Sequence, residues 1–267
     1  MPKDIPVTKQ VPASERTTCE ATGQMLEKAR KDGVILNLDR AVDMKACPIG
    51  VDSACCKHCF MGPCRLNPRD PYKKVGICGA TIDTITARNL ARNVATGSAS
   101  HNDHGQHILH LFKGIVEKNI TDFSIANPLK LQQLAQELGI DTEDRLIEEV
   151  AKDLCDELQK TFSNVDGEMP FMKRVPPATL ELWRKDGIVP RGAMREIMEL
   201  MHRTHMGVDQ HYENITRQCS RTALSDGWGG SMVATEISDI LFGTPVPVAA
   251  DVNMGVLKEN MVNIIVH

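Results

Sequence analysis

Several features that would assign a protein to a familiar class are scarce in this sequence of 267 residues. Aromatic side chains are few, with six Phe, two Tyr and two Trp, so the core must be filled mainly by aliphatic residues and the 13 Met. A basic excess is missing too, because 31 Lys and Arg stand against 35 Asp and Glu and leave a net charge of −4. Nucleic acid is therefore not an expected partner.

The sequence also has no apolar run near the ~18 residues that a membrane span requires. Its N-terminal segment is polar and lacks the apolar core of a secretion signal. We therefore expect a cytoplasmic protein whose thiols stay reduced. Clustered Cys residues in such a protein are more often metal ligands or catalysts than disulfides.

The hydrophobic pattern is helical over most of the chain. After an arm of 13 residues, Ser14 is expected to cap a helix that stops at Gly33. A long helical pattern runs from about residue 80 to residue 116 and loosens near Gly97. Six further helices are predicted, at 128–139, 142–161, 174–186, 192–206, 209–223 and 231–241. The expected fold class is therefore mainly α, with a helical domain over residues 1–240.

The last residues follow a different pattern. Two stretches, 245–251 and 262–266, are short, rich in β-branched residues and flanked by turn residues, which predicts two strands. Residues 241–267 are therefore expected to begin an α/β domain. Because the sequence stops at His267, directly after an apolar strand, we expect that domain to continue and the chain to be a fragment.

Six of the nine Cys fall within residues 47–78, in a segment rich in Gly and Pro that has no sustained period. Four of them offer the number of thiolates that a [4Fe–4S] cluster takes: Cys56, Cys59, Cys64 and Cys78. A structural zinc site prefers two short pairs, whereas only the first gap here is short. The spacing favours an iron–sulfur cluster over zinc, and either metal over ordinary buried thiols.

Cys47 and Cys55 form a second, smaller group. Two thiolates cannot hold a cluster, but a second copy of the chain across a two-fold axis would supply two more. Two buried structural thiols explain the pair equally well on residue statistics. The remaining three, Cys19, Cys155 and Cys219, have no assigned role.

Basic residues surround the cysteines in the sequence. Between Cys56 and Cys78 there are five basic residues (Lys57, Arg65, Arg69, Lys73 and Lys74) and one acid, Asp70. A surface that steers an acidic redox partner and a merely solvated loop both fit this excess.

Four histidines recur at every third position: His101, His104, His107 and His110. On a helix this row rises ~13.5 Å while turning about half a turn, so neighbouring rings can meet although the four share no single face. Imidazole titrates near neutral pH, which favours a proton relay. A His-rich surface helix is the next alternative. A metal site is the third, because helical metal pairs are typically spaced i,i+4 and no Glu accompanies this row.

The cysteine and histidine motifs together carry a resemblance to a known family. The matching stretches are CPIGVDSACCKHCFMGPCR at 47–65, VGICGA at 75–80, SASHNDHGQH at 98–107, GWGGSMVATE at 227–236 and VNIIVH at 262–267. The chain resembles the N-terminal portion of the catalytic subunit of anaerobic nickel–iron carbon monoxide dehydrogenase. The resemblance covers essentially the whole chain, and it is specific because the motifs occur together and in order.

This resemblance implies a homodimer that oxidises carbon monoxide with water to carbon dioxide, two protons and two electrons, reversibly, at a nickel–iron–sulfur cluster. The four cysteines from Cys56 to Cys78 match the ligands of a [4Fe–4S] relay cluster in each subunit. Cys47 and Cys55 match the pair that joins its symmetry mate in a cluster at the dimer interface. His101 matches an acid–base group beside the active cluster. His104, His107 and His110 match a channel that carries protons away.

The resemblance also sets limits on the chain itself. The family's Lys acid–base partner and most nickel–iron ligands lie beyond residue 267, so the resemblance implies that this fragment alone is inactive. It implies that residues 241–267 are the first strands of a truncated Rossmann-like domain. Implied partners are a ferredoxin-like electron acceptor and, as alternative companions, an acetyl-CoA synthase or a hydrogenase. The competing hypotheses are a non-enzymatic iron–sulfur electron-transfer or cluster-binding module and a zinc-stapled helical domain.

Overall fold

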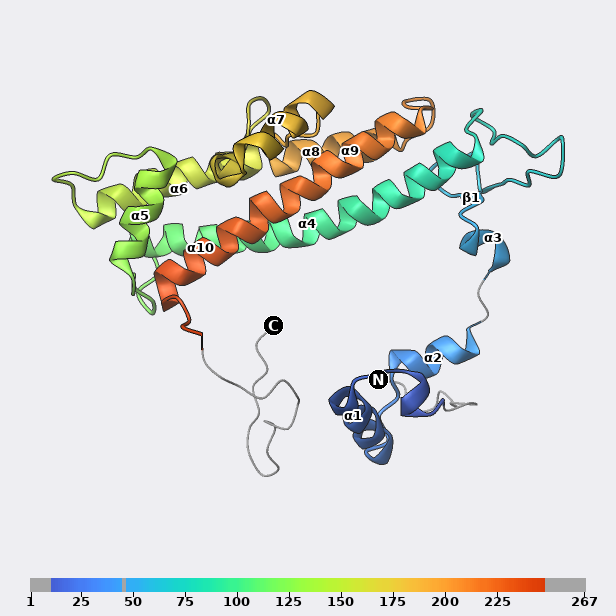
Figure 1. Cartoon of the computed structure of the whole chain (residues 1–267), viewed down its shortest axis with the longest axis horizontal. Helices are drawn as coiled ribbons and strands as arrows, with labels where there is room; N and C mark the ends of the chain where they lie inside the picture. The colour runs from blue at the N-terminus through green and yellow to red at the C-terminus, as the bar shows by residue number, and fades with distance from the viewer. Residues whose placement is uncertain (1–10, 45–46, 248–267) are drawn as a thin grey trace. The chain divides into compact units, whose positions relative to one another are not determined.

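The computed structural model describes residues 11–44 and 47–247, which divide between two compact units that we treat separately. Of the described residues, the first unit comprises 11–44, 47–48 and 246–247, and the second comprises 49–245. Within the described part the chain is mainly helical, as the sequence predicts, and its only strands are two of two residues each (Figure 1). The predicted strand at 262–266 and most of that at 245–251 lie outside the described residues, as does the start of a Rossmann-like domain. Residues 245–247 have no regular structure.

In the first unit, the described residues form η1 (Ala13–Glu15), α1 (Glu20–Lys31) and α2 (Asn37–Asp43). The prediction that Ser14 caps the first helix is wrong. Ser14 lies in η1, and α1 begins after Cys19, whose backbone N–H donates to Thr17 Oγ1 at 3.0 Å. The predicted stop is correct, because Gly33 takes a positive φ of 69° just after the helix.

One long helix, α4 (Ile82–Val116), is the axis of the second unit. Thr81 caps it by accepting a hydrogen bond from the Thr84 backbone N–H at 3.3 Å. The helix runs unbroken through Gly97, where the sequence pattern loosens. Its continuity follows from packing, because three later helices contact α4: α8 (Ala193–Arg203), α9 (Tyr212–Ser225) and α10 (Ser231–Phe242).

The remaining helices of the second unit largely follow the sequence prediction. They are α5 (Pro128–Leu138), α6 (Ile147–Ser163), η2 (Pro170–Arg174), α7 (Pro177–Asp186), α8 (Ala193–Arg203), α9 (Tyr212–Ser225), η3 (Asp226–Gly230) and α10 (Ser231–Phe242). The helix predicted at 174–186 begins later, at Pro177, because Pro176 and Pro177 cannot donate to a preceding turn and Arg174 ends η2.

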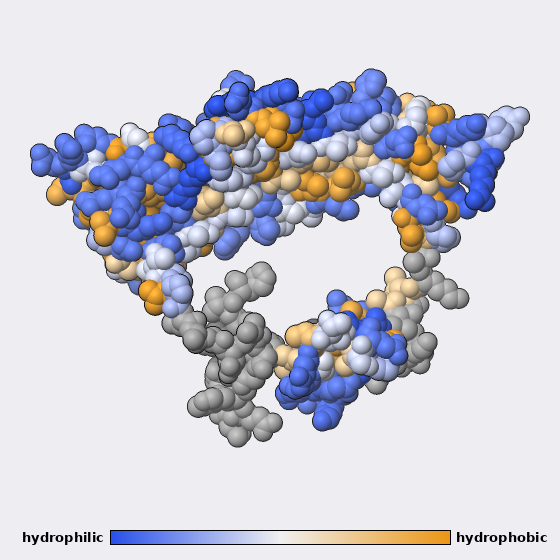
Figure 2. Space-filling model, viewed as in Figure 1, coloured by the Kyte–Doolittle hydropathy of each residue, from blue (hydrophilic) through white to orange (hydrophobic). Residues whose placement is uncertain are grey.

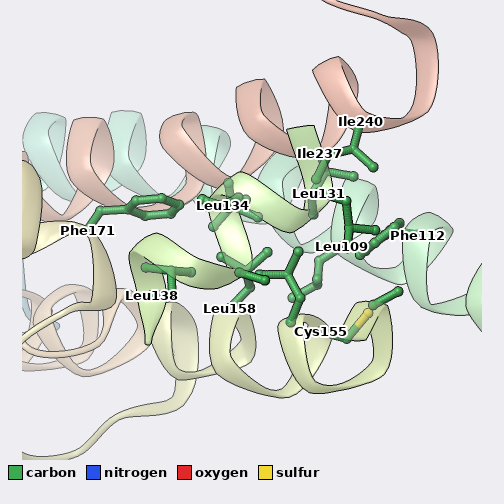
Figure 3. Close-up of a cluster of buried hydrophobic side chains, with 14 of the residues drawn as sticks. Leu109, Phe112, Leu131, Leu134, Leu138, Cys155, Leu158, Phe171, Ile237 and Ile240 are labelled. Carbon is green, nitrogen blue, oxygen red and sulfur yellow. The ribbon is translucent and has the colours of Figure 1, made fainter. Parts of the chain in front are cut away.

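Helices α9, η3 and α10 follow one another in a nearly continuous run beside α4 (Figure 1). The main core lies where α5, α6 and α10 pack on the C-terminal half of α4, and it contains Phe112, Leu134, Leu158 and Ile237 (Figure 3). A second cluster joins small α4 residues to α8 and α9. None of the described helices is both long and apolar enough to cross a membrane.

Candidate functional site

The cysteine segment folds as a small loop unit at the N-terminal end of α4. It contains α3 (Pro48–Val51) and an antiparallel pair of strands, β1 (Cys55–Cys56) and β2 (Cys64–Arg65). Cys56 lies directly opposite Cys64 in this pair. The connecting loop turns back tightly at Gly62, where a Cβ atom would lie 3.0 Å from the Cys64 nitrogen. The hairpin therefore brings Cys56 and Cys64, which are eight positions apart in the sequence, close together.

The structure brings the four cysteines of the first predicted group together. Cys56, Cys59, Cys64 and Cys78 line one small pocket, together with His58, Met206 and Arg88. Cys78 reaches it from the turn before α4, in which the Gly76 N–H donates to the Ala80 carbonyl at 2.9 Å.

The geometry of this pocket bears on the kind of metal group it fits. No three His, Cys, Asp or Glu side chains in the described parts of the chain converge as ligands of a single metal ion. A [4Fe–4S] cube is bound at four separate iron atoms, so its thiolates surround a space instead of meeting at a point. Four thiols around a pocket fit that requirement.

Hydrogen-bond donors are directed at the sulfur atoms. The Ile77 backbone N–H lies 3.5 Å from Cys64 Sγ, and Arg88 Nη1 lies 3.8 Å from Cys78 Sγ. Burial raises the pKa of the Cys56 thiol. Burial acts in the same direction on Cys78, but donors from Ala80, Arg88 and Gln210 outweigh it and lower the pKa of that thiol. Donors of this kind favour the thiolate, which is the form that binds metal.

Cys47 and Cys55 are described in different units. Cys47 is exposed in the first unit, and Cys55 is half-buried at the start of β1 in the second.

The surface beside the pocket is partly apolar. Hydrophobic surface is visible at the end of the second unit that carries β1 (Figure 2), and Phe60, Met61 and Ile77 are exposed in this segment. In the basic loop, Lys73 Nζ pairs with Asp70 at 3.1 Å.

All four histidines of the predicted row lie on α4 with exposed side chains. His101 is the one held in place by a carboxylate, since its Nδ1 lies 2.8 and 2.9 Å from the two carboxylate oxygens of Asp226. His107 Nε2 lies 4.0 Å from Asp103. His101 is separate from the cysteine pocket, because 13 residues of α4 after Arg88 correspond to roughly 20 Å.

Two close contacts hold the His101 and Asp226 pair. Asp226 begins η3, where the backbone bends at Gly229, and it also accepts a hydrogen bond from Ser231 Oγ at 3.0 Å. Next to His101, the buried Asn102 accepts a hydrogen bond from the Gly230 N–H at 2.9 Å. The η3 turn is therefore fixed against α4 at the position of the imidazole.

Asp226 and Arg88 are site residues that sequence reasoning missed. The signal for Asp226 was its place directly before Gly-Trp-Gly-Gly, a break between two helical patterns. Arg88 gave no comparable signal, because a basic residue in an amphipathic helix is ordinarily solvent-exposed.

The three cysteines without a predicted role are all outside the pocket. Cys155 and Cys219 are buried in the helical cores, and burial raises their pKa values to about 12 and about 11. Such thiols are inert packing groups. Cys19 is exposed at the start of α1, where hydrogen bonds from Thr22 lower its pKa.

Comparison with known proteins agrees with these motifs. The Prismane/CO dehydrogenase family matches residues 54–267. Carbon monoxide dehydrogenase 1 of Methanosarcina mazei is 45% identical over 256 residues, which are 96% of this chain and 41% of that protein. Carbon monoxide dehydrogenase/acetyl-CoA synthase subunit beta of Moorella thermoacetica is 36% identical over 270 residues, which are 100% of this chain and 40% of that protein.

Solved structures match along the same length. Nickel-free carbon monoxide dehydrogenase from Thermococcus sp. AM4 superimposes with a TM-score of 0.86 at 39% identity, over 95% of this chain and 40% of that chain. A structure of acetyl-CoA synthase/carbon monoxide dehydrogenase superimposes with a TM-score of 0.82 at 34% identity, over 92% of this chain and 37% of that chain. The chain thus spans about two fifths of the length of the relatives it matches. The match over residues 54–267, with relatives of this identity along nearly the whole chain, shows that it belongs to the Prismane/CO dehydrogenase family.

Proposed function

We propose that this chain is the electron-relay and proton-transfer part of a nickel–iron carbon monoxide dehydrogenase. The observation that carries the proposal is the pocket in which Cys56, Cys59, Cys64 and Cys78 meet. A [4Fe–4S] cluster bound there would accept and pass on single electrons. The Ile77 N–H and the Arg88 guanidinium, both directed at ligand sulfurs, would stabilise the thiolates and influence the cluster's reduction potential.

His101 is the proposed acid–base group. With Nδ1 held by the Asp226 carboxylate, its Nε2 is the nitrogen left to take up or release a proton. We assign His104, His107 and His110, which continue along α4, to the onward transfer of protons with water between the rings.

The proposed assembly is a homodimer. A second copy would complete the ligand set of Cys47 and Cys55 in an interface cluster. The exposed Phe60 and Met61 beside the cysteine pocket support burial of this region against another protein. We infer a ferredoxin-like electron acceptor, an anaerobic and cytoplasmic setting, and an acetyl-CoA synthase as a companion, since two of the similar proteins carry that name.

The same proposal indicates which parts of the whole protein would hold the active cluster and its ligands. We place the nickel–iron–sulfur cluster, most of its ligands and the Lys acid–base partner in the part of the relatives' length that this chain does not span. The Rossmann-like domain expected over residues 241–267 would contribute to that part. The 267-residue chain by itself is therefore expected not to oxidise carbon monoxide.

The first experiment tests the cluster. Protein purified without oxygen should be brown and should contain iron and sulfide in equal amounts. Cys64→Ser should lose about four iron atoms per chain. Cys219→Ser is the control, because this thiol lies outside the pocket and should leave the iron content unchanged. Zinc in place of iron, or equal iron in both variants, would contradict the proposal.

A second experiment tests the assigned roles. Replacing Cys47 and Cys55 together by Ser should remove one cluster signal while the relay-cluster spectrum persists. In the whole protein, His101→Ala should slow carbon monoxide oxidation with normal nickel content. A protein that binds clusters but never oxidises carbon monoxide would instead be a non-enzymatic electron-transfer module.

A further inference from the structure

The side chain of Arg88 is unusual among the charged groups of the second unit. It lies in the second turn of α4 and is only 1% exposed. Among the described residues it is the largest side chain that is fully buried. Its guanidinium lines the same pocket as the four cysteines. A permanent positive charge is therefore removed from water next to the proposed cluster.

The hydrogen bonds of Arg88 do not neutralise this charge. Nη2 donates to the backbone carbonyl of Asp209 at 2.6 Å, which is a neutral acceptor. Nη1 faces Cys78 Sγ at 3.8 Å, and the buried Nε has no hydrogen-bond partner. The Asp209 carboxylate is engaged elsewhere, with Arg203 Nη1 at 2.7 Å.

Other buried charged side chains in the same unit, unlike Arg88, have a partner of opposite charge. Glu196 and Glu236 are both nearly inaccessible, and each forms an ion pair with an arginine, Arg191 at 2.8 Å and Arg174 at 2.7 Å. No ion pair of the described residues includes Arg88. A buried cation without an anion is strongly destabilising, so an anionic group bound in the pocket would stabilise the fold around Arg88.

We propose that Arg88 is the fixed counter-charge of the iron–sulfur cluster held by the four cysteines, and that it sets the cluster's reduction potential. The inference rests on the proposed function. Four thiolates outweigh the positive charge of the iron–sulfur core, so the bound group is an anion that gains one more negative charge on reduction. A buried cation at one ligand sulfur favours the reduced form and raises the reduction potential. Arg88 is thus a positioning residue that acts on the cluster through charge.

The first test is a redox titration of the whole protein, followed by electron paramagnetic resonance. The relay-cluster signal is identified as the one that Cys64→Ser removes. Arg88→Met should lower its reduction potential enough to change the ratio of reduced to oxidised cluster about tenfold, which corresponds to about 59 mV for one electron. Arg88→Lys keeps the charge and should keep the reduction potential close to that of the wild type.

The matched control is Arg92→Met, one helical turn further along α4. Arg92 is half-buried, and its Nε donates to Thr204 Oγ1 at 3.1 Å. Arg92→Met removes the same charge from the same helix, but Arg92 does not line the pocket. The fall in the reduction potential should therefore be several-fold smaller than for Arg88→Met. Equal shifts for Arg88→Met and Arg92→Met would overturn the inference.

The second test measures stability with and without the cluster. In protein with the cluster, Arg88→Met should release iron to a chelator about tenfold faster than the wild type. In protein stripped of iron, the same variant should be no less stable to urea than the wild type, because the anion with which Arg88 pairs is gone. A variant that is less stable in both forms would mark Arg88 as an ordinary packing residue.

The outcomes separate this inference from the function on which it rests. If the wild-type protein carries no iron–sulfur cluster, the proposed function fails first. If the cluster is present and its potential is the same in Arg88→Met and the wild type, only the counter-charge role of Arg88 fails.

Discussion

The His101 imidazole and the Asp226 carboxylate come from positions 125 residues apart, yet they meet at hydrogen-bond distance. A carboxylate on one ring nitrogen fixes the orientation of the ring and determines which nitrogen faces away from it. Either effect would assist an acid–base group, but only if the imidazole takes part in proton transfer. The pair therefore allows a direct test of the role assigned to His101.

Asp226→Asn in the whole protein should lower kcat for carbon monoxide oxidation roughly tenfold to hundredfold, with KM and nickel content close to normal. The amide keeps the shape of the side chain but removes its charge. Steady-state kinetics with metal analysis measures this effect. Combining Asp226→Asn with His101→Ala should be no worse than His101→Ala alone, because the carboxylate acts through the ring. Additive losses would mean that Asp226 has a separate role.

Glu199 illustrates how a half-buried carboxylate is kept ionised. It lies 2.7 Å from Arg191, 2.8 Å from Arg203 and 3.2 Å from Arg195. Burial would raise its pKa, but the hydrogen bonds from Arg191 and Arg203 outweigh burial and lower the pKa from 4.5 to about 2. A carboxylate whose pKa is depressed by folding stabilises the native state above its unfolded pKa and loses that contribution as pH falls.

Glu199→Gln should therefore destabilise the protein at pH 7, by up to about 3 kcal/mol if the whole pKa difference is realised. The difference in unfolding free energy between the wild type and the variant should shrink as pH falls from about 4.5 towards about 2. Urea unfolding at a series of pH values measures this dependence. A difference that stays constant down to pH 3 would show that packing, and not ionisation, is what the substitution removes.

At the level of elements, the crossing of α4 with η3 depends on two glycines. A Cβ atom on Gly105 would lie 2.6 Å from both the Cα and the carbonyl oxygen of Gly230. The two backbones therefore touch directly, one turn of α4 after His101. Only glycine at both positions allows this approach, which also keeps Asp226 within reach of the imidazole.

Gly105→Ala should destabilise the protein by about 1–3 kcal/mol, because backbone atoms have to move to admit the methyl group. Gly97→Ala, in the same helix, is the matched control. Nothing lies within 4 Å of its added Cβ, so it should stabilise α4 by roughly 0.5–1 kcal/mol. Thermal or urea unfolding of both variants measures the difference. Equal effects of the two substitutions would mean that the close contact is not maintained in solution.

Sequence periodicity predicted most of the helices because their apolar residues recur at helical spacing over ten or more positions. It failed where a local hydrogen bond decides a boundary. Ser14 is a good capping residue by type, yet the backbone forms η1 there, and α1 begins only after Cys19. Short elements such as α2 and α3 have too few residues for a period to be visible.

The sequence predicted the cysteines of the candidate site but not two of its charged residues. The spacing of Cys56, Cys59, Cys64 and Cys78 sufficed to group them, because those residue types are rare and their separations are short. Asp226 and Arg88 are common residue types, and their importance comes from contacts with residues far away in sequence. Such pairings follow from tertiary packing and leave no periodic signal.

For the whole molecule, the cysteine pocket and the helical cores are separate centres of stability. The main core is formed by helices α4, α5, α6 and α10 and contains none of the pocket cysteines. The cluster around the pocket is much smaller, with Cys56, Leu66, Ala80 and Ile85 as its buried members. Because so little apolar surface is buried here, we expect the proposed cluster to hold this segment in one conformation.

Removing iron with a chelator should therefore loosen residues 54–80 while the helices persist. Hydrogen exchange followed by mass spectrometry should show faster exchange in peptides from this segment and unchanged protection in α6, with a far-UV circular dichroism signal close to that of the intact protein. Cys64→Ser protein should exchange like the chelated wild type, and Cys219→Ser protein like the untreated one, because Cys219 packs in the second helical cluster. Loss of protection in α6 to the same degree would mean that the metal stabilises the fold as a whole. Local loosening alone would mean that the helices position the His101 and Asp226 pair independently of the proposed relay cluster. The groups proposed for electron transfer and for proton transfer would then belong to separately stable parts of one unit.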